Sequence, residues 1–319
     1  MLELKWLWKY MGPKRCYLVI GLFLSAITSG MLVVNPMLSQ KLIDEVITPK
    51  NTEKLLPILG MMMAVQMVRL TLRYVMVVLL EKNSQQMLDD VRTRMYDVIQ
   101  SEDYRFFSYM RTGDLMTRMT NDLDLIRHST SWISYNIIDS AVIFTATIVY
   151  FFTVNVKLTL YLIIVTPLIL LVTILFSKKI HPMYRSLREK LSSLNTIAQE
   201  NIEGNRVVKA FAREEFEKEK FEARNEEYRK SNLKISYVGA KFQPVIDLLS
   251  QSLTITTLLV GGIFMINGSM TAGQLLAFTS MTWALSNPLR NLGMLINEIQ
   301  RFFASCDMVM EVFFQGIRN

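Results

Sequence analysis

Six long apolar stretches constrain this chain more than any other feature of its sequence. A helix needs about 20 apolar residues to cross the ~30 Å hydrocarbon core of a bilayer. Because hydrocarbon offers no partner for backbone polar groups, such spans fold as helices. The predicted spans are Tyr17–Leu42, Leu55–Leu80, Trp132–Thr153, Lys157–Phe176, Val238–Ile266 and Ala272–Ile296. The sequence therefore predicts an all-α membrane protein with six transmembrane helices.

Two charged insertions separate the spans, at about 81–128 and 178–237. In the first, Leu88, Val91 and Met95 recur at helical spacing, which predicts an amphipathic helix. Neither Pro nor Gly separates the second span from this insertion, so we expect the helix to continue beyond the membrane. Each insertion is predicted to be a pair of long helices that protrudes about 35–40 Å, from the rise of 1.5 Å per residue, with a short turn at its tip.

The charge distribution predicts the orientation of these spans. The chain carries a net charge of +7, and most of its 35 Lys and Arg lie in the two insertions and near the termini. Basic residues are retained on the cytoplasmic side of a membrane, so both insertions and both termini are expected there. This asymmetry indicates that the basic residues set the membrane orientation of the chain and do not form a nucleic-acid-binding surface. Cys16 and Cys306 are then expected to be reduced thiols, and two isolated histidines give no metal-ligand pattern.

Residues 1–13 are predicted to form an elbow helix that lies in the inner membrane interface. Trp6, Trp8 and Tyr10 suit the headgroup region, and Pro13 ends the helix. Residues 14–310 are then expected to form the six-helix membrane domain, with 311–319 beginning a linker. The tail Glu311–Gly316 partly resembles an engineered protease site but departs from it at Phe313 and at the following Ile317, so native linker sequence is the favoured interpretation.

Three runs of sequence at the loop tips and the sixth span resemble the type I ABC exporters. They are GDLMTRMTNDLD (Gly113–Asp124), ENIEGNRVVKAFAREEFEKEKF (Glu200–Phe221) and MTAGQLLAF (Met270–Phe278). The resemblance covers nearly the whole chain. It implies a half-transporter that pairs with a second half, as a homodimer or heterodimer, and works with nucleotide-binding domains that bind Mg-ATP. It also implies a multi-pass protein of a bacterial plasma membrane that exports an amphipathic small molecule, lipid or peptide by alternating access.

The resemblance further implies that a coupling helix at each loop tip docks onto a nucleotide-binding domain, at about Phe107–Met116 and Lys209–Glu217. The residues implied for the first helix are Phe107, Tyr109, Arg111, Gly113 and Asp114. The sequence pattern itself predicts that Gly113 breaks the helix at this tip. Those implied for the second are Lys209, Ala210, Phe211, Arg213, Glu214 and Glu215. Aromatic groups far from the membrane need a partner surface; alternatively, some of them pack between the helices of their own insertion.

The sequence contains no GxxxxGK[ST] stretch, which is the backbone cradle that P-loop ATPases use for phosphate. We therefore expect this chain alone neither to bind nor to hydrolyse ATP, and we assign no catalytic residue, metal ligand or cofactor to it. Two other interpretations stay open. One is a non-transporting dimerisation or signalling module of the same fold, and the other is a polytopic membrane enzyme, which the lack of a catalytic cluster in the spans disfavours.

Charged residues inside the spans mark a candidate substrate cavity. A cation near the bilayer centre costs at least ~2.5 kcal/mol, so it should face a cavity or a counter-charge. The candidate residues are Arg69, Arg73, Asp247, Asn287 and Arg290. A substrate cavity and a structural ion pair between helices explain the two arginines equally well, and the sequence leaves both open.

Overall fold

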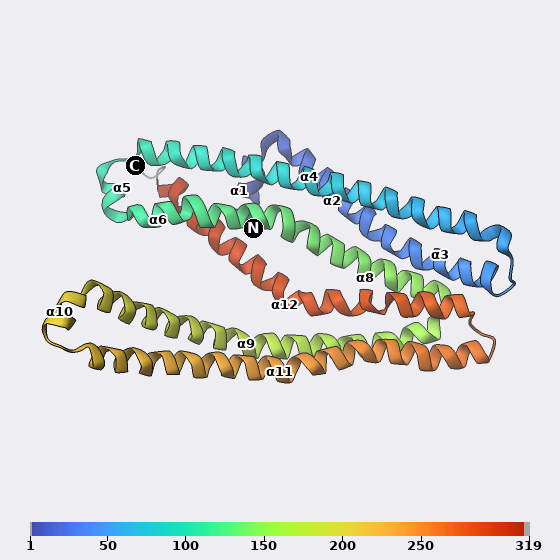
Figure 1. The fold of residues 1–319 in the computed structure, drawn as a ribbon. Helices are drawn as coiled ribbons and strands as arrows, with labels where there is room; N and C mark the ends of the chain where they lie inside the picture. Colours follow the sequence, from blue (N-terminus) through green and yellow to red (C-terminus); the bar gives the residue numbers. More distant parts are fainter. Residues whose placement is uncertain (1, 316–319) are drawn as a thin grey trace. The chain divides into compact units, whose positions relative to one another are not determined.

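The computed structural model describes residues 2–315, which form helices and no strands (Figure 1). The α-helices are α1 (Leu2–Tyr10), α2 (Arg15–Gly30), α3 (Val34–Leu42), α4 (Leu55–Ser101), α5 (Tyr104–Tyr109), α6 (Thr112–Thr117), α7 (Leu123–His128), α8 (Ser134–Val154), α9 (Val156–Glu203), α10 (Asn205–Ala210), α11 (Glu214–Ile266) and α12 (Ala272–Gln315). Short 3₁₀ or π segments join some of them: η1 (Gly12–Lys14), η2 (Met31–Val33), η3 (Ile43–Ile47), η4 (Thr52–Lys54), η5 (Arg118–Asp122) and η6 (Ser129–Ile133).

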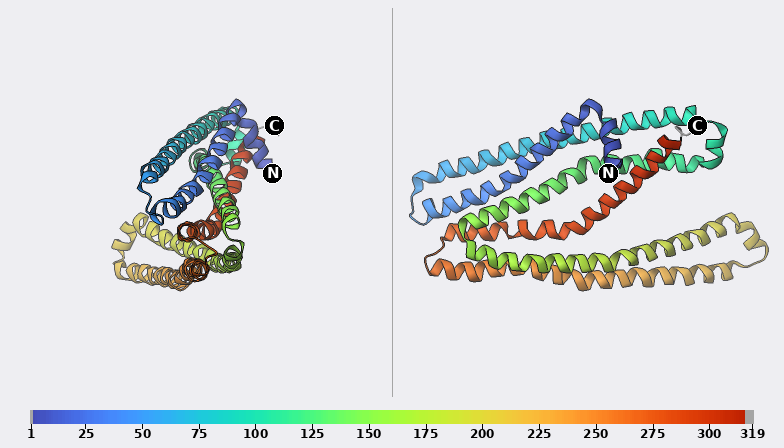
Figure 2. Two further views of the ribbon diagram at one scale, coloured as in Figure 1. Left: turned by 90° about the vertical axis from the view of Figure 1, so that its right-hand side faces the viewer. Right: turned by 180° about the vertical axis from the view of Figure 1, so that it is seen from behind.

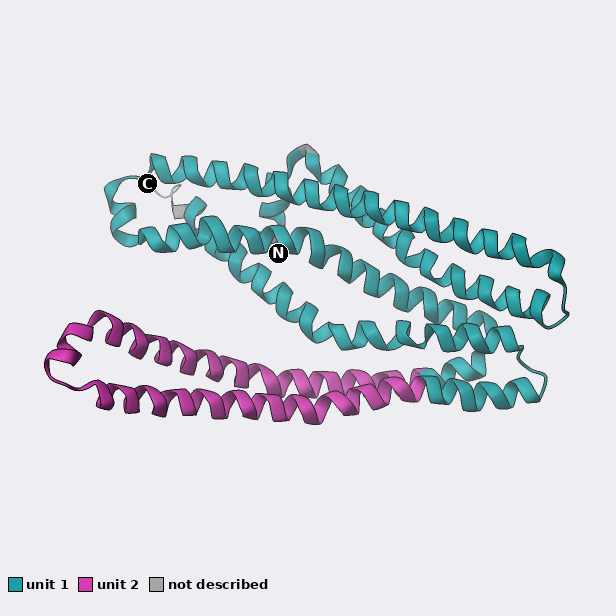
Figure 3. Cartoon of the chain, in the orientation of Figure 1, with its two compact units in different colours: residues 1–162, 254–319 teal, residues 163–253 magenta. Residues whose placement is uncertain are grey.

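The chain divides into two compact units (Figure 3). Unit 1 contains residues 1–162 and 254–319, and unit 2 contains residues 163–253. Helix α9 begins in unit 1, and helix α11 ends in unit 1. The other parts of these two helices form the long helical pair of unit 2. The all-α fold expected from the apolar stretches is confirmed.

Within residues 2–315, five helical segments are long and apolar enough to cross a membrane: Arg15–Ile47, Thr52–Ser101, Thr112–Val154, Val156–Glu203 and Glu214–Ile266. They contain the first five predicted spans. The sixth predicted span lies in α12, a helix of 44 residues. Polar residues from Asn287 onward interrupt its apolar run, which explains why length and composition alone do not single it out within residues 2–315.

In unit 1, the long helices pack side by side around α2 and α12. Helix α2 lies against α4 and α8, and α12 lies against α3 and α8 (Figure 2). Helix α4 buries Met87, Val91 and Met95 at helical spacing, so one stripe of its length beyond Leu80 faces the protein. This stripe joins side chains of α1, α5–α7 and α12 in one core of buried apolar residues.

Helix α1 belongs to this core, which corrects part of the elbow prediction. Leu7 and Met11 are buried, and so is Trp6, which was expected among lipid headgroups. The Trp6 and Tyr10 rings lie 5.7 and 5.4 Å from the ring of Phe313. Trp8 alone of the three predicted interfacial aromatics is exposed. Aromatic packing against α12 therefore holds α1, while Trp8 remains available to the headgroup region.

Helix α12 continues past residue 311, where the linker was predicted to begin, and ends at Gln315. Val312 and Phe313 are buried in the same core. Phe313, at which the tail departs from the protease-site pattern, is one of these buried residues. Its burial is in keeping with the interpretation that the tail is native sequence. Residues 316–319 of the predicted linker lie outside the described residues.

A capping box starts α12 and gives a structural role to Thr271 and Gln274 in the run Met270–Phe278. The backbone N–H of Gln274 donates to Oγ1 of Thr271 (3.1 Å), and the N–H of Thr271 donates to Oε1 of Gln274 (2.9 Å). The N–H of Gly273 donates to Oδ1 of Asp44, which follows α3, over 3.0 Å. A carboxylate at a helix N-terminus is favourable. A Cβ at Gly273 would lie 2.7 Å from the same oxygen, so this close approach requires glycine.

Unit 2 is a pair of long helical segments from α9 and α11, joined at α10. The rings of Phe176 and Phe242 lie 5.4 Å apart. Further along, Nζ of Lys190 donates to Oγ of Ser231 over 2.6 Å. Helix α9 runs on past Phe176 to Glu203, which adds about 40 Å at 1.5 Å per residue. The long helical extension predicted for the second insertion is therefore confirmed.

Candidate functional site

The tip of the first insertion contains two short helices, where one was predicted at Phe107–Met116. Oδ1 of Asp103 accepts the N–H of Phe106 (3.1 Å) and caps α5. The chain breaks at Met110 and Arg111, whose backbones are extended, and α6 follows. Gly113 lies inside α6 and not at the break. The prediction of Gly113 as the breaker is therefore wrong, because two extended residues make the turn.

Neighbouring phenylalanines at this tip have opposite environments. Phe106 is 6% exposed and belongs to the unit 1 core, whereas Phe107 is 45% exposed. Their rings meet edge to face with centroids 5.4 Å apart. Met110 and Leu115 are buried beside Phe106. Packing within the insertion thus accounts for Phe106, and it leaves Phe107 and Tyr109 on the surface.

Charged residues at the first tip also divide into two groups. Arg111 and Asp114 are exposed, together with Gly113. Arg118, by contrast, points into the unit. Its Nη2 lies 2.7 Å from Oε2 of Glu311, and its Nη1 donates to the carbonyl of Met308 over 3.1 Å. This arginine therefore ties the tip to the last turns of α12.

At the second tip the short helix is α10. It ends at Ala210, whereas the coupling helix was predicted at Lys209–Glu217. Ala212 has a positive φ of 46°. Its N–H donates to the carbonyl of Lys209 (3.2 Å), and the N–H of Arg213 donates to the carbonyl of Val208 (3.0 Å). This is a Schellman motif, which terminates a helix through a left-handed residue. Glu214 then starts α11, whose acidic first turn suits a helix N-terminus.

All the residues predicted for the second tip are exposed: Lys209, Ala210, Phe211, Arg213, Glu214 and Glu215. Phe211 is 74% exposed, directly after α10. The guanidinium of Arg213 lies over the ring of Phe216, 5.6 Å from its centroid. This tip therefore presents an aromatic ring with charges of both signs around it.

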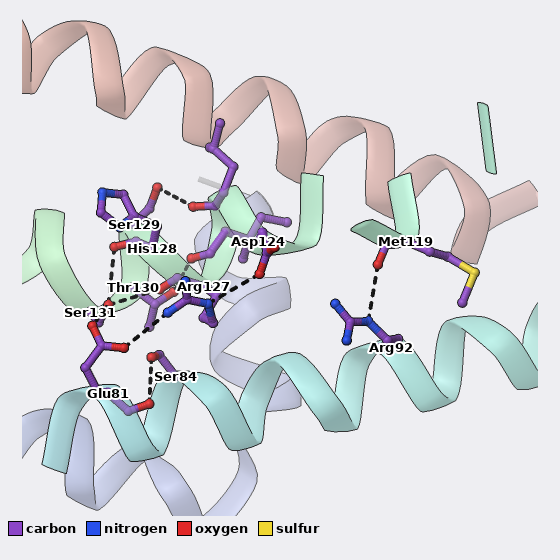
Figure 4. A network of polar contacts seen from close by, with 12 residues as sticks. Glu81, Ser84, Arg92, Met119, Asp124, Arg127, His128, Ser129, Thr130 and Ser131 are labelled. Atoms are coloured by element: carbon purple, nitrogen blue, oxygen red, sulfur yellow. Dashed lines mark hydrogen bonds and ion pairs between the residues drawn. The ribbon is translucent and has the colours of Figure 1, made fainter. Parts of the chain in front are cut away.

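The sequence reasoning missed a polar network that joins the two limbs of the first insertion (Figure 4). Nη1 of Arg127 lies 3.1 Å from Oε2 of Glu81, and Oγ of Ser131 donates to Oε1 of Glu81 over 3.1 Å. Nearer the tip, Nε of Arg92 donates to the carbonyl of Met119 (3.2 Å).

A signal for this network existed in the sequence. Glu81 and Arg127 lie equally far from Tyr104, where α5 begins. Opposite charges on the two limbs of a helical hairpin suggest such a pair, but its register depends on α5 and on the break at Met110 and Arg111, which the sequence did not locate.

Arg69 and Arg73 lie one turn apart on α4 in different environments. Arg69 is half-buried, and its Nε donates to the carbonyl of Thr28 in α2 over 3.2 Å. Arg73 is exposed. Asp139 of α8 lies close enough to attract Arg69 electrostatically, and it also accepts a hydrogen bond from Ser29. The structure thus gives Arg69 structural partners and leaves the side chain of Arg73 on the surface of α4.

The other cavity candidates fall on two helices. Asn287 and Arg290 lie one turn apart on α12, where Asn287 is exposed and Arg290 is half-buried. Asp247 lies on α11 in unit 2, where Nε2 of Gln243 donates to its Oδ1 over 3.4 Å. The five candidates therefore form two neighbouring pairs in unit 1 and one residue of unit 2.

The chain matches the family described as ABC transporter transmembrane region over residues 18–289. It is 26% identical to an uncharacterised ABC transporter ATP-binding protein, YknU, of Bacillus subtilis (strain 168), over 95% of this chain and 52% of the relative. It is 27% identical to the multidrug resistance-like ATP-binding protein MdlA of Buchnera aphidicola subsp. Baizongia pistaciae, over 95% and 52%. It is 28% identical to the ATP-dependent lipid A-core flippase of Syntrophus aciditrophicus, over 93% and 48%. The chain spans about half the length of these curated relatives.

Proposed function

The chain belongs to the family of ABC transporter transmembrane regions, in its type I exporter form, and from this premise we propose that it forms the substrate pathway of an ATP-driven exporter. On this proposal the pathway works by alternating access. The two loop tips receive the motion of nucleotide-binding domains, which bind Mg-ATP. Both tips and both termini lie on the cytoplasmic side.

The observation that carries this proposal is the exposure of Phe107 and Phe211 at the ends of long continuous helices. Phe107 lies on α5, whose N-terminus is capped by Asp103. Phe211 directly follows α10, whose C-terminus is closed by backbone hydrogen bonds of Ala212 and Arg213. Exposed aromatic groups with a charged surround are typical of docking surfaces. Helices of this length transmit a rigid displacement with little loss. A domain docked at the tips would therefore move the membrane segments of the same helices.

The tips themselves offer no phosphate cradle, because the sequence lacks the GxxxxGK[ST] loop. We therefore place ATP binding in nucleotide-binding domains outside this sequence and derive no step of hydrolysis from its residues. The names of the relatives include ATP-binding proteins, which supports this division of labour.

The apolar window of α4 supports pairing with a second half-transporter. None of it is buried within the chain, and Arg73 is exposed further along the same helix. A cation that faces lipid near the bilayer centre costs at least ~2.5 kcal/mol. We therefore propose that Arg73 faces a water-filled pathway shared by two halves, while Arg69 anchors α4 to α2. Arg290 and Asn287 of α12 and Asp247 of α11 are further candidates for this pathway.

Relatives named as a multidrug resistance-like protein and a lipid A-core flippase support an amphipathic substrate for this chain. The test is reconstitution of the chain with its nucleotide-binding domains in lipid vesicles. Transport that requires ATP, and ATP hydrolysis that rises with an amphipathic substrate, are the expected results. Hydrolysis that no amphipathic substrate changes, with no transport, would contradict the exporter proposal and favour the signalling alternative.

The orientation is tested separately by labelling single cysteines in right-side-out vesicles. A cysteine placed at Asn51 should react with an impermeant maleimide, and one at Ser192 should be protected. The reverse pattern would contradict the proposed orientation.

A further inference from the structure

Unit 1 contains an apolar cavity of about 630 Å³ beneath helix α1. Its walls come from α1, α2, the segment η6–α8 and α12, and they include Leu18, Ile137 and Phe302. Pockets for small ligands typically measure ~300–1,000 Å³. The cavity is thus large enough to hold an apolar chain.

The hydroxyl groups that line the cavity are satisfied within the protein. The hydroxyls of Ser129 and Thr130 donate to the carbonyls of Leu125 and Ile126, each over 2.8 Å. The hydroxyl of Ser134 donates to the carbonyl of Ser129 over 3.2 Å. Since these donors are already used, the interior favours an apolar occupant.

One cation lines the cavity on the α1 side, and a second lies against a lining side chain. Lys5 is an exposed lining residue. Trp8, which also lines the cavity, lies under the guanidinium of Arg15 at 5.5 Å, and Nε of Arg15 donates to the carbonyl of Trp8 over 2.5 Å. This edge therefore favours an anionic group beside an apolar chain.

The position of the cavity along the helices matches the boundary of the membrane. Leu18 and Ile137 belong to the predicted first and third spans, whereas Ser129 and Lys5 lie outside them. An occupant would therefore extend from hydrocarbon to water. An anionic phospholipid has this arrangement of charge and apolar chain.

We propose that this cavity binds one acyl chain of an anionic phospholipid, with its phosphate beside Lys5 and Arg15. The assignment to the cytoplasmic leaflet rests on the proposed orientation, whereas the binding itself does not. The lipid would brace α1 against α12, because Phe302 belongs both to the cavity wall and to the core that holds Trp6 and Phe313.

The test uses the full chain, purified in mild detergent and stripped of lipid. Native mass spectrometry measures retention of phosphatidylglycerol and of phosphatidylcholine with the same acyl chains. We expect one tightly held phosphatidylglycerol per chain. Lys5→Gln should weaken its binding about fivefold, which corresponds to the ~1 kcal/mol that one basic residue contributes beside an anionic lipid. Lys9→Gln is the matched control, because Lys9 is exposed on the same helix without lining the cavity, and it should change binding by less than about twofold.

A second variant, Ser134→Phe, fills the cavity without changing charge, and it should remove the tightly held lipid. Circular dichroism and gel filtration test whether this variant is folded. If it is not folded, the comparison of Lys5→Gln with Lys9→Gln decides whether the cavity binds the lipid. Equal effects of Lys5→Gln and Lys9→Gln would overturn the proposal, and so would unchanged retention in folded Ser134→Phe. Displacement of the phosphatidylglycerol by a transported amphiphile would assign the cavity to the substrate and overturn the lipid assignment.

Discussion

Phe106 and Phe107 offer a direct comparison between a core residue and a docking residue at one tip. Phe106 is 6% exposed and packs in the unit 1 core, whereas Phe107 is 45% exposed. Replacing a buried phenylalanine by alanine typically costs about 3–5 kcal/mol. About half of the Phe107 side chain is exposed, so its truncation should lose roughly half of the ~1.5–3 kcal/mol assigned to full burial.

Both variants also lose the edge-to-face contact between the two rings, worth about 0.5–1.5 kcal/mol. Phe107→Ala should therefore lower the free energy of unfolding by about 1–3 kcal/mol, and Phe106→Ala by about 3–5 kcal/mol. The isolated chain in detergent is suitable for this test, because the prediction concerns folding alone.

The assay combines thermal unfolding with amide hydrogen exchange over α5–α7. Phe106→Ala should lower the midpoint of unfolding clearly and speed exchange in α6 and α7. Phe107→Ala should leave exchange in α7 close to that of the native chain. If the two variants lose equal stability, Phe107 is a core residue as well, and its assignment to a docking surface is wrong.

Three further predictions concern other sites. Arg73→Ala should change the substrate concentration for half-maximal transport and leave thermal stability unchanged. Arg69→Ala should lower thermal stability, because it loses the hydrogen bond to α2. Equal stability losses in the two variants would contradict the cavity assignment of Arg73. Burial, assisted by the charge of Asp307, raises the pKa of the Cys306 thiol to about 12, so maleimide at pH 7–9 should label exposed Cys16 and not Cys306 until the chain is unfolded. Ala212→Gly should relieve the left-handed strain, worth about 1–2 kcal/mol, and slow hydrogen exchange at the α10 end; faster exchange would refute this.

The sequence predicted the long helices well, because their apolar length and the missing breakers are local properties. The first insertion shows this clearly, since α4 continues past Leu80 to Ser101 with no Pro or Gly in that stretch. Burial at the tips was harder to predict. The adjacent residues Phe106 and Phe107 are chemically identical, and only the packing of α5 decides which one enters the core.

Helix boundaries at the tips were predicted less well for a second physical reason. The sequence suggested glycine as the breaker at residue 113, but extended backbone at Met110 and Arg111 makes that turn. At the second tip a left-handed alanine, Ala212, ends the helix where propensity favours glycine. The contact of Arg118 with Glu311 required tertiary information, because these residues lie far apart in the sequence.

The central claim is that the tips couple ATP hydrolysis to transport, and Phe211→Ala tests it most directly. The measurement is the number of substrate molecules transported per ATP hydrolysed by the chain assembled with its nucleotide-binding domains in vesicles. Tyr184→Ala is the control, because Tyr184 is an exposed aromatic on the shaft of α9, away from the tip. Truncation of an interface anchor typically costs ~2 kcal/mol or more, so Phe211→Ala should lower this ratio more than about tenfold while Tyr184→Ala preserves it. A native ratio for Phe211→Ala, or an equal loss in both variants, would contradict the account.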